Sequence, residues 1–156
     1  MSLLPSQGTS FFTGKKRKGG LGLELKYRKG IVYTDFSVGR DLEGYKNVAN
    51  GAIVFGVLDV TMWYAIFMET AKICMTRKVD IDFFKPVICD RLYRAQSKLL
   101  RVEDRDVWVT AWVDGPDQER CTEVTGLFRE PAAPITPDFS DLDFSGVSPE
   151  IRERFR

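Results

Sequence analysis

The chain has 156 residues, about the size of one domain, and this length predicts a single hydrophobic core. Its 23 basic and 22 acidic residues nearly balance, so a net charge of +1 gives no overall field that would attract nucleic acid or an anionic membrane. The sequence contains no histidine, which excludes Ser-His-Asp and Cys-His catalytic pairs and imidazole metal sites. Any catalysis must therefore use carboxylates, hydroxyls, lysines or backbone amides.

The three cysteines are widely spaced and form no C-x-x-C pair; they are Cys74, Cys89 and Cys121. An odd number at such spacings predicts neither a disulfide framework nor a zinc site, so we expect no metal and a reducing, cytoplasmic location. The first residues, MSLLPSQGTSFF, lack the basic and apolar regions of an export signal, and we expect none.

Residues 1–20 form an N-terminal segment that ends in a basic loop containing KKRK. From Leu21 to Tyr27, apolar residues alternate with polar ones or glycine, which predicts a half-buried strand. A turn at Lys29-Gly30 precedes β-branched and aromatic residues over 31–38, which predict a second strand. We expect these two strands to form a hairpin.

The next segment is long and almost entirely apolar. Asp59 is the only charged residue between Asn47 and Met68, and this length could span a membrane. An aspartate in mid-span would cost roughly 2.5 to 3.5 kcal/mol on insertion, and the flanking segments have the patterns of soluble β-structure. We therefore expect the buried central helix of a globular domain and no membrane span.

Four strands are predicted after the helix, over residues 78–83, 92–102, 107–113 and 121–129, and we expect them to form a meander. Pro86 ends the first of them. The fold class is therefore α+β, with one antiparallel sheet wrapped around one long helix in a domain over 21–130. Residues 131–156 are a Pro- and Asp-rich extension, in which Ser148-Pro149-Glu150 predicts the start of a short terminal helix.

Five segments together resemble the hotdog-fold acyl-CoA thioesterases, particularly the phenylacetic-acid-degradation type: GGLGLELKYR, NGAIVFGVLD, VDIDFFKPV, VWVTAWVDG and CTEVTGLFRE. The resemblance covers Phe12 to Arg129. Members of this family typically open the helix with His-Gly-Gly and carry an acid nine residues after the histidine. Gly51 and Asp59 match that pattern, whereas Asn50 replaces the histidine and Ala52 the second glycine.

Thioester hydrolysis requires hydrogen-bond donors for the developing oxyanion and a carboxylate that attacks the carbonyl or activates water. The resemblance implies that the Gly51 amide, at the helix N-terminus, is the donor and that Asp59 is the carboxylate. Asn50 either touches the carbonyl or only caps the helix. Thr76 lies where the family often has a Ser or Thr that orients the acid or the water.

Gly51 and Asp59 cannot act together within one chain. Eight residues at ~1.5 Å each place them about 12 Å apart along the helix, whereas a reacting carbon must lie within roughly 3 to 4 Å of both groups. Two antiparallel helices related by a two-fold axis would place each Asp59 near the partner's glycine. We therefore expect a homodimer, or a dimer of dimers, with shared sites.

An acyl-CoA substrate brings phosphates, and four basic residues are candidates to bind them: Lys85, Arg77, Lys78 and Lys18. CoA enters only as part of the substrate, so we expect no separate cofactor. We also expect no nucleic-acid partner, because no basic face with interleaved aromatic residues is evident. The aromatic residues Trp63, Tyr64 and Phe67 have helical spacing typical of a core, although they could line an acyl pocket.

Three alternatives remain open at this stage. The departures at Asn50 and Ala52, and a valine at Val60 in place of a second acid, are compatible with a hotdog protein that binds an acyl thioester or another lipid-like ligand without hydrolysing it. A hotdog dehydratase is less expected, because that chemistry usually pairs an acid with a histidine. In a purely structural partner protein, Asp59 would be a buried acid satisfied by a local hydrogen bond.

Overall fold

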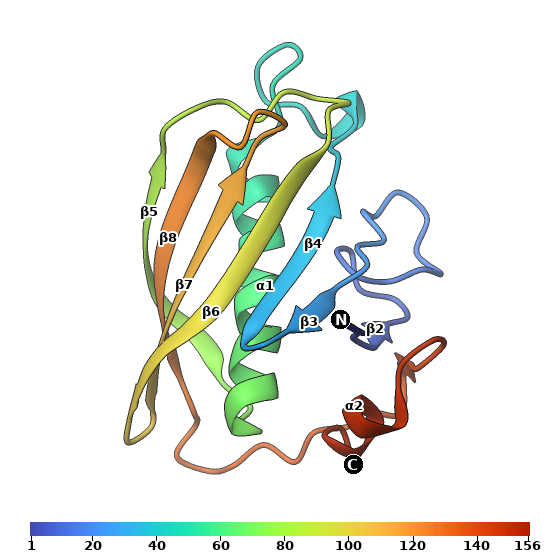
Figure 1. The fold of residues 1–156 in the computed structure, drawn as a ribbon, viewed down its shortest axis with the longest axis vertical. Helices are drawn as coiled ribbons and strands as arrows, with labels where there is room; N and C mark the ends of the chain where they lie inside the picture. The colour runs from blue at the N-terminus through green and yellow to red at the C-terminus, as the bar shows by residue number, and fades with distance from the viewer.

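The structure is a computed structural model that describes residues 1–156. A seven-stranded antiparallel sheet curves around one long helix, α1 (Gly51–Thr70), and the N- and C-terminal segments lie on the same side of the molecule, near the β3 end of the sheet (Figure 1). The other elements are β1 (Ser2–Leu3), β2 (Ser6–Gln7), β3 (Lys26–Arg28), β4 (Ile31–Phe36), a 3-10 turn (Arg40–Leu42), β5 (Met75–Phe83), β6 (Tyr93–Glu103), β7 (Asp106–Asp114), β8 (Arg120–Arg129), β9 (Leu142–Asp143) and α2 (Pro149–Glu153).

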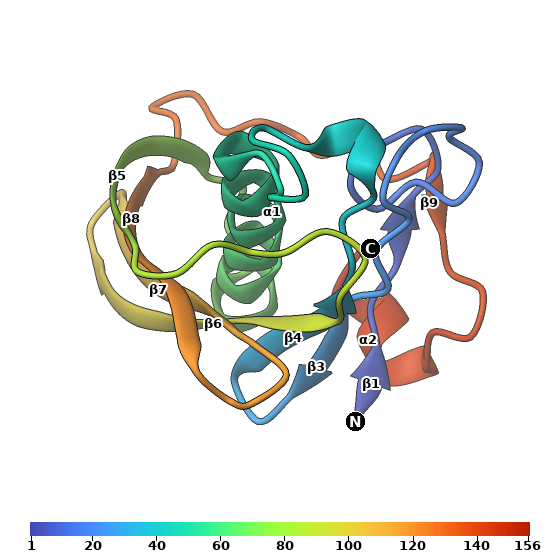
Figure 2. The same ribbon diagram turned by 90° about the horizontal axis from the view of Figure 1, so that it is seen from above.

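The strand order is β1-β3-β4-β6-β7-β8-β5, which confirms the antiparallel sheet but not the four-strand meander. Of the four strands after α1, only β6, β7 and β8 are sequential neighbours, and β5 pairs with β8 at the edge of the sheet. Residues 84–92 carry the chain across the N-terminal end of α1 (Figure 2). This crossing is held by backbone bonds between Ala49 and Val87 and between Cys89 and Asn47.

The hairpin of β3 and β4 is present, but the first strand is shorter than predicted. Only Lys26–Arg28 is regular strand, although Leu23 and Leu25 are buried as the alternation predicted. The amides of Leu21 and Leu23 instead donate to Phe11 and Phe12, so the N-terminal segment takes up their hydrogen bonds. Alternation correctly indicated which residues are buried but not their bonding partners.

Helix α1 forms the centre of the core. Its residues Val57, Leu58, Met62 and Ala65 have no exposed surface, and the helix packs mainly on β6 and β7. The helix is long and apolar enough to cross a membrane, but it is mostly buried inside the fold. In this structure its apolar surface is therefore used to pack the concave face of the sheet.

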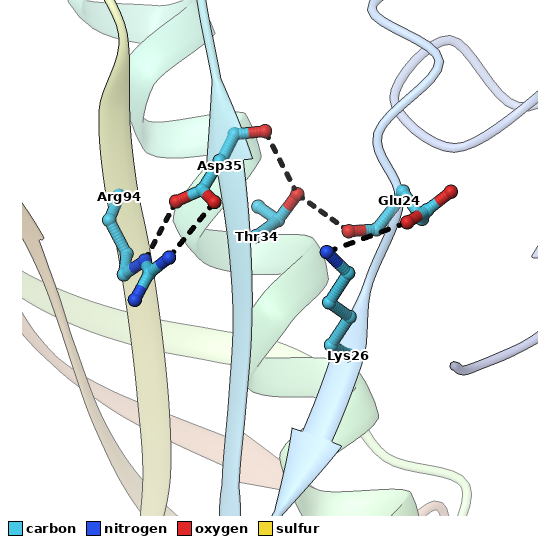
Figure 3. A network of polar contacts seen from close by, with 5 residues as sticks. All are labelled: Glu24, Lys26, Thr34, Asp35 and Arg94. Atoms are coloured by element: carbon cyan, nitrogen blue, oxygen red, sulfur yellow. Dashed lines mark hydrogen bonds and ion pairs between the residues drawn. The ribbon is translucent and has the colours of Figure 1, made fainter. Parts of the chain in front are cut away.

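The outer face of the sheet carries an ion pair between two of its strands. Asp35 of β4 receives hydrogen bonds from Nε and Nη2 of Arg94 on β6, at 2.7 and 2.9 Å, and Thr34 and Lys26 contact Glu24 beside this pair (Figure 3). The Arg94 guanidinium lowers the pKa of Asp35 below its ordinary value. This pair joins two neighbouring strands on the exposed face.

The two terminal segments pack against each other. Strand β2 pairs with β9, and the predicted terminal helix is present as α2. The helix starts where the sequence predicts, with Ser148 at the N-cap, although the Ser148 hydroxyl makes no hydrogen bond. Ile151 and Phe155 bury their side chains, so the end of the extension is docked on the domain.

Candidate active site

The N-terminus of α1 presents one free amide. Asn50 is the N-cap, and its Oδ1 accepts a hydrogen bond from the Ala52 amide at 2.9 Å. The Asn50 carbonyl accepts from the amides of Ile53 and Val54. The Gly51 amide has no acceptor in the structure and the residue is exposed, so it is available to a ligand at the positive end of the helix.

A cavity of about 290 Å³ lies in front of this amide, and its lining includes Gly51, Val54, Phe83 and Lys85. Lys85 forms an ion pair with Glu119, and this hydrogen-bonded carboxylate raises the pKa of the lysine. Lys85 therefore stays positively charged at the edge of the cavity. Two further aromatic residues in the lining are largely exposed, namely Tyr45 and Phe84.

Asp59 and Thr76 are brought together from different elements. Thr76 lies on the edge strand β5, and its hydroxyl donates to Oδ1 of Asp59 at 2.6 Å. Asp59 is half-buried on α1. The Thr61 hydroxyl donates instead to the Leu58 carbonyl, so it does not satisfy the acid. The bond from Thr76 fixes the carboxylate and leaves its second oxygen without a partner in the structure.

A second cavity, of about 340 Å³, adjoins Asp59 on α1. Trp63 and Tyr64 are among its lining residues, whereas Phe67 is buried in the core behind it. The remaining walls come from the terminal segments and include Phe12, Phe139 and Phe155, none of which the sequence had indicated as site residues. The sequence did contain a signal for the walls from the Pro- and Asp-rich extension. Its phenylalanines indicate packing on the domain, because a solvated tail rarely carries large apolar side chains.

Gly51 and Asp59 are not brought together within the chain. They line two different cavities, about 12 Å apart along the helix. Between them, the face of α1 that the sheet does not cover is partly accessible and mostly apolar; its residues are Ala52, Phe55, Asp59, Val60 and Trp63. This uncovered face connects the two halves of the candidate site.

The four predicted phosphate-binding residues do not form one cluster. Arg77 and Lys78 follow Thr76 on β5, where a bulge interrupts the register, and both are exposed. Lys85 lies near the start of α1, and Lys18 belongs to the exposed N-terminal loop. The structure contains no group of three or more potential metal ligands.

Comparisons with known proteins extend this description. No protein-family profile matches the chain. An uncharacterized protein of Schizosaccharomyces pombe is 28% identical over 115 residues, which are 70% of this chain and 65% of that protein. Acyl-coenzyme A thioesterase THEM4 of Rattus norvegicus is 30% identical over 125 residues, which are 75% of this chain and 53% of that enzyme. The chain thus spans between about half and two thirds of the length of these relatives.

Solved structures match the architecture over most of the chain. A thioesterase superfamily protein superposes with a TM-score of 0.71 at 20% identity, covering 76% of this chain and 62% of the other. PaaI, from the phenylacetic acid degradation operon of E. coli, has a TM-score of 0.67 at 15% identity, covering 74% and 84%. The chain has the hotdog fold. The predicted fold class is thereby confirmed, and the predicted resemblance to acyl-CoA thioesterases agrees with the sequence likeness to THEM4.

A third hotdog structure contains a ligand. A hypothetical thioesterase from Streptococcus pneumoniae, determined with coenzyme A, has a TM-score of 0.64 at 15% identity and covers 69% of this chain and 87% of its own. The hotdog fold of this chain is therefore shared with proteins described as thioesterases, one of them in complex with coenzyme A.

Proposed function

We propose that this hotdog protein is an acyl-CoA thioesterase. The observation that carries the proposal is the Thr76–Asp59 hydrogen bond, which orients a carboxylate on an accessible helix face beside a cavity. The likeness to THEM4, an acyl-coenzyme A thioesterase, and to a hotdog protein determined with coenzyme A supports the same substrate class.

The chemistry follows from the donors and acceptors at hand. The Gly51 amide donates to the thioester oxygen and stabilises its developing negative charge. Asp59 then either attacks the carbonyl carbon directly, forming an acyl-enzyme anhydride that water hydrolyses, or takes a proton from the attacking water. In both cases the carbon–sulfur bond breaks, and the CoA thiolate leaves and gains a proton. Thr76 holds the Asp59 carboxylate in position throughout.

The site requires two copies of the chain. Because about 12 Å separates Gly51 from Asp59 along one helix, a partner helix running antiparallel must supply one of the two groups. The uncovered apolar face of α1 and the unpaired edge of β5 are surfaces that a second copy would cover. The proposed assembly is a homodimer, or a dimer of dimers, with two shared sites.

The CoA portion would lie toward positive charge. The basic residues that we propose for its phosphates are Lys85 near the Gly51 cavity, Arg77 and Lys78 beside Thr76, and Lys18 in the N-terminal loop. No cofactor beyond the CoA of the substrate enters the scheme. The cysteines are free and buried, which supports a reducing, cytoplasmic setting.

A second function is favoured by one observation. The side chain of Asn50 accepts the hydrogen bond of the Ala52 amide. A single backbone amide, that of Gly51, therefore remains free to donate to an oxyanion. A site with so few donors would suit a hotdog protein that binds an acyl thioester without hydrolysing it.

Thiol release from short, aromatic and long acyl-CoAs separates the two functions. The thioesterase should turn over at least one of them, and Asp59→Asn should lower kcat at least ~100-fold, because the amide cannot act as base or nucleophile. Stabilisation by acyl-CoA with no turnover would identify the binding protein. Turnover that survives Asp59→Asn would remove Asp59 from the chemistry.

A further inference from the structure

The cavity beside Asp59 has a lining that is half apolar and half polar or glycine. It measures about 340 Å³, and its apolar lining consists of Phe12, Val60, Trp63, Tyr64, Phe139, Leu142 and Phe155. Trp63 lies one helical turn beyond Asp59 on α1, so the cavity extends along the helix from the carboxylate. A group bound at Asp59 would therefore have the apolar side chains of this cavity next to it.

The N-terminal segment closes one side of this cavity. A side-chain carbon at Gly56 would lie 2.0 Å from the Phe12 ring, so the ring rests directly on the helix backbone where only glycine leaves room. The Tyr64 hydroxyl donates to the Pro5 carbonyl at 2.8 Å, which fixes the start of the chain to the helix. These contacts make the N-terminal segment a defined wall.

The C-terminal extension closes the far side. Phe139 and Phe155 pack edge to face with ring centroids 5.4 Å apart, and Phe155 also contacts the Phe67 ring. The Arg154 guanidinium donates to the Met68 carbonyl, which anchors the end of the extension near the end of α1. The extension is thus attached to the same helix that carries Asp59.

We infer that this cavity is the acyl pocket and that the terminal segments set the size of the acyl group; the inference rests on the proposed thioesterase function. A methylene occupies about as much space as a water molecule, whose share of liquid volume is about 30 Å³, so the cavity holds on the order of ten non-hydrogen atoms. The pocket therefore takes a medium-length acyl group and excludes a long one. The carboxylates of Asp138 and Asp141, also in the lining, disfavour acyl chains that end in a carboxylate.

A matched pair of phenylalanines tests the inference. Phe139 and Phe144 are both half-buried in the extension and both pack edge-on against Phe155, with centroid distances of 5.4 and 6.0 Å. Only Phe139 lines the cavity. Phe139→Ala should therefore open the pocket, whereas Phe144→Ala should perturb the extension to a similar degree without changing the pocket.

The first measurement is kcat/KM over saturated acyl-CoAs from butyryl to palmitoyl. The wild type should prefer medium chains. Phe139→Ala should raise the ratio of long-chain to medium-chain kcat/KM about tenfold, because added space in an apolar pocket changes discrimination by that order per group. Phe144→Ala should keep the wild-type ratio. Equal ratios in wild type and Phe139→Ala, or equal shifts in both variants, would overturn the inference.

Binding of non-hydrolysable S-alkyl-CoA thioethers separates this inference from the proposed function. Thermal stabilisation of the wild type should be largest with octyl and smaller with hexadecyl thioether, and Phe139→Ala alone should remove that difference. If this dependence on chain length is observed but no acyl-CoA is turned over, the proposed hydrolysis is contradicted and the inferred acyl pocket is still supported. Stabilisation that does not depend on chain length would overturn the pocket even in an active enzyme.

Discussion

Thr76 is the residue whose contact most directly links the fold to the proposed chemistry. Its hydroxyl is the only hydrogen-bond donor to the Asp59 carboxylate in the structure. It reaches the helix from the edge strand of the sheet. A hydrogen bond to a charged group contributes roughly 1.5 to 3 kcal/mol, enough to determine which way the carboxylate points.

Thr76→Val should therefore lower kcat by roughly ten- to a hundredfold with little change in KM, because the variant keeps the shape and strand preference but loses the hydroxyl. Thr76→Ser should restore most of the activity. Steady-state thiol release from both variants checks this. An unchanged kcat in Thr76→Val would show that the hydrogen bond does not position the acid.

A pH-dependent contribution to stability is expected from the Arg94–Asp35 pair. The pKa of Asp35 is lowered in the folded state, mainly by the hydrogen bond from Arg94. The pair therefore stabilises the fold above the unfolded-state pKa of about 3.9, and that stabilisation is lost as the pH falls through the lower folded-state pKa. Both side chains are more than a third exposed, so solvent screening keeps the effect small.

Asp35→Asn should reduce the free energy of unfolding by about 0.5 kcal/mol at neutral pH, and the difference from the wild type should vanish in acid below the folded-state pKa. Asp80→Asn is the control, because Asp80 is an exposed strand aspartate without an ion pair. Denaturant unfolding at several pH values checks both variants. A difference that persists undiminished in acid would show that the ionic pair is not its cause.

At the scale of elements, α1 combines the core and the site. Its buried face fills the concave side of the sheet, while its N-terminus and uncovered face present Gly51 and Asp59. The N-cap determines where the helix begins and therefore which amide remains free. In this chain the cap is Asn50.

Asn50→Ala should lower the free energy of unfolding by about 1 kcal/mol, because the Ala52 amide loses its acceptor, while kcat of the folded fraction should change less than about twofold. Asn50→Asp retains the cap and should retain stability. Thermal unfolding and thiol release, measured on both variants, decide whether Asn50 only caps the helix or also contacts the thioester. A stable Asn50→Asp variant with strongly reduced kcat would show that the asparagine amide touches the thioester.

The sequence was informative where the cause is local. An acid in an apolar helix and a glycine at the helix start indicated Asp59 and Gly51, whereas the family resemblance indicated Thr76; the structure brings Asp59 and Thr76 into contact. The position of β5 at the edge was not predicted, because alternation specifies the buried face of a strand and not its neighbour. The cavity walls at Phe12 and Phe139 depend on contacts between distant segments, which no local pattern encodes.

At the scale of the whole molecule, the central claim is that each site is shared between two copies. Gly51→Pro removes the free amide, and the helix start should tolerate it. Proline is favoured at the first helical position, and the extended Asn50 backbone, with ψ of 130°, is compatible with a following proline. Gly51→Ala is its control; the added carbon would lie 3.6 Å from the Phe83 ring, an ordinary contact.

The most direct test is the activity of mixed dimers of Gly51→Pro and Asp59→Asn, each inactive alone, after subunit exchange. Equal mixing should restore about a quarter of the wild-type thiol release, because half of the dimers are mixed and each mixed dimer has one intact site. Gly51→Ala should remain active on its own. If mixed dimers are shown to form but no activity returns, the two groups do not act across an interface, and the shared-site account is contradicted.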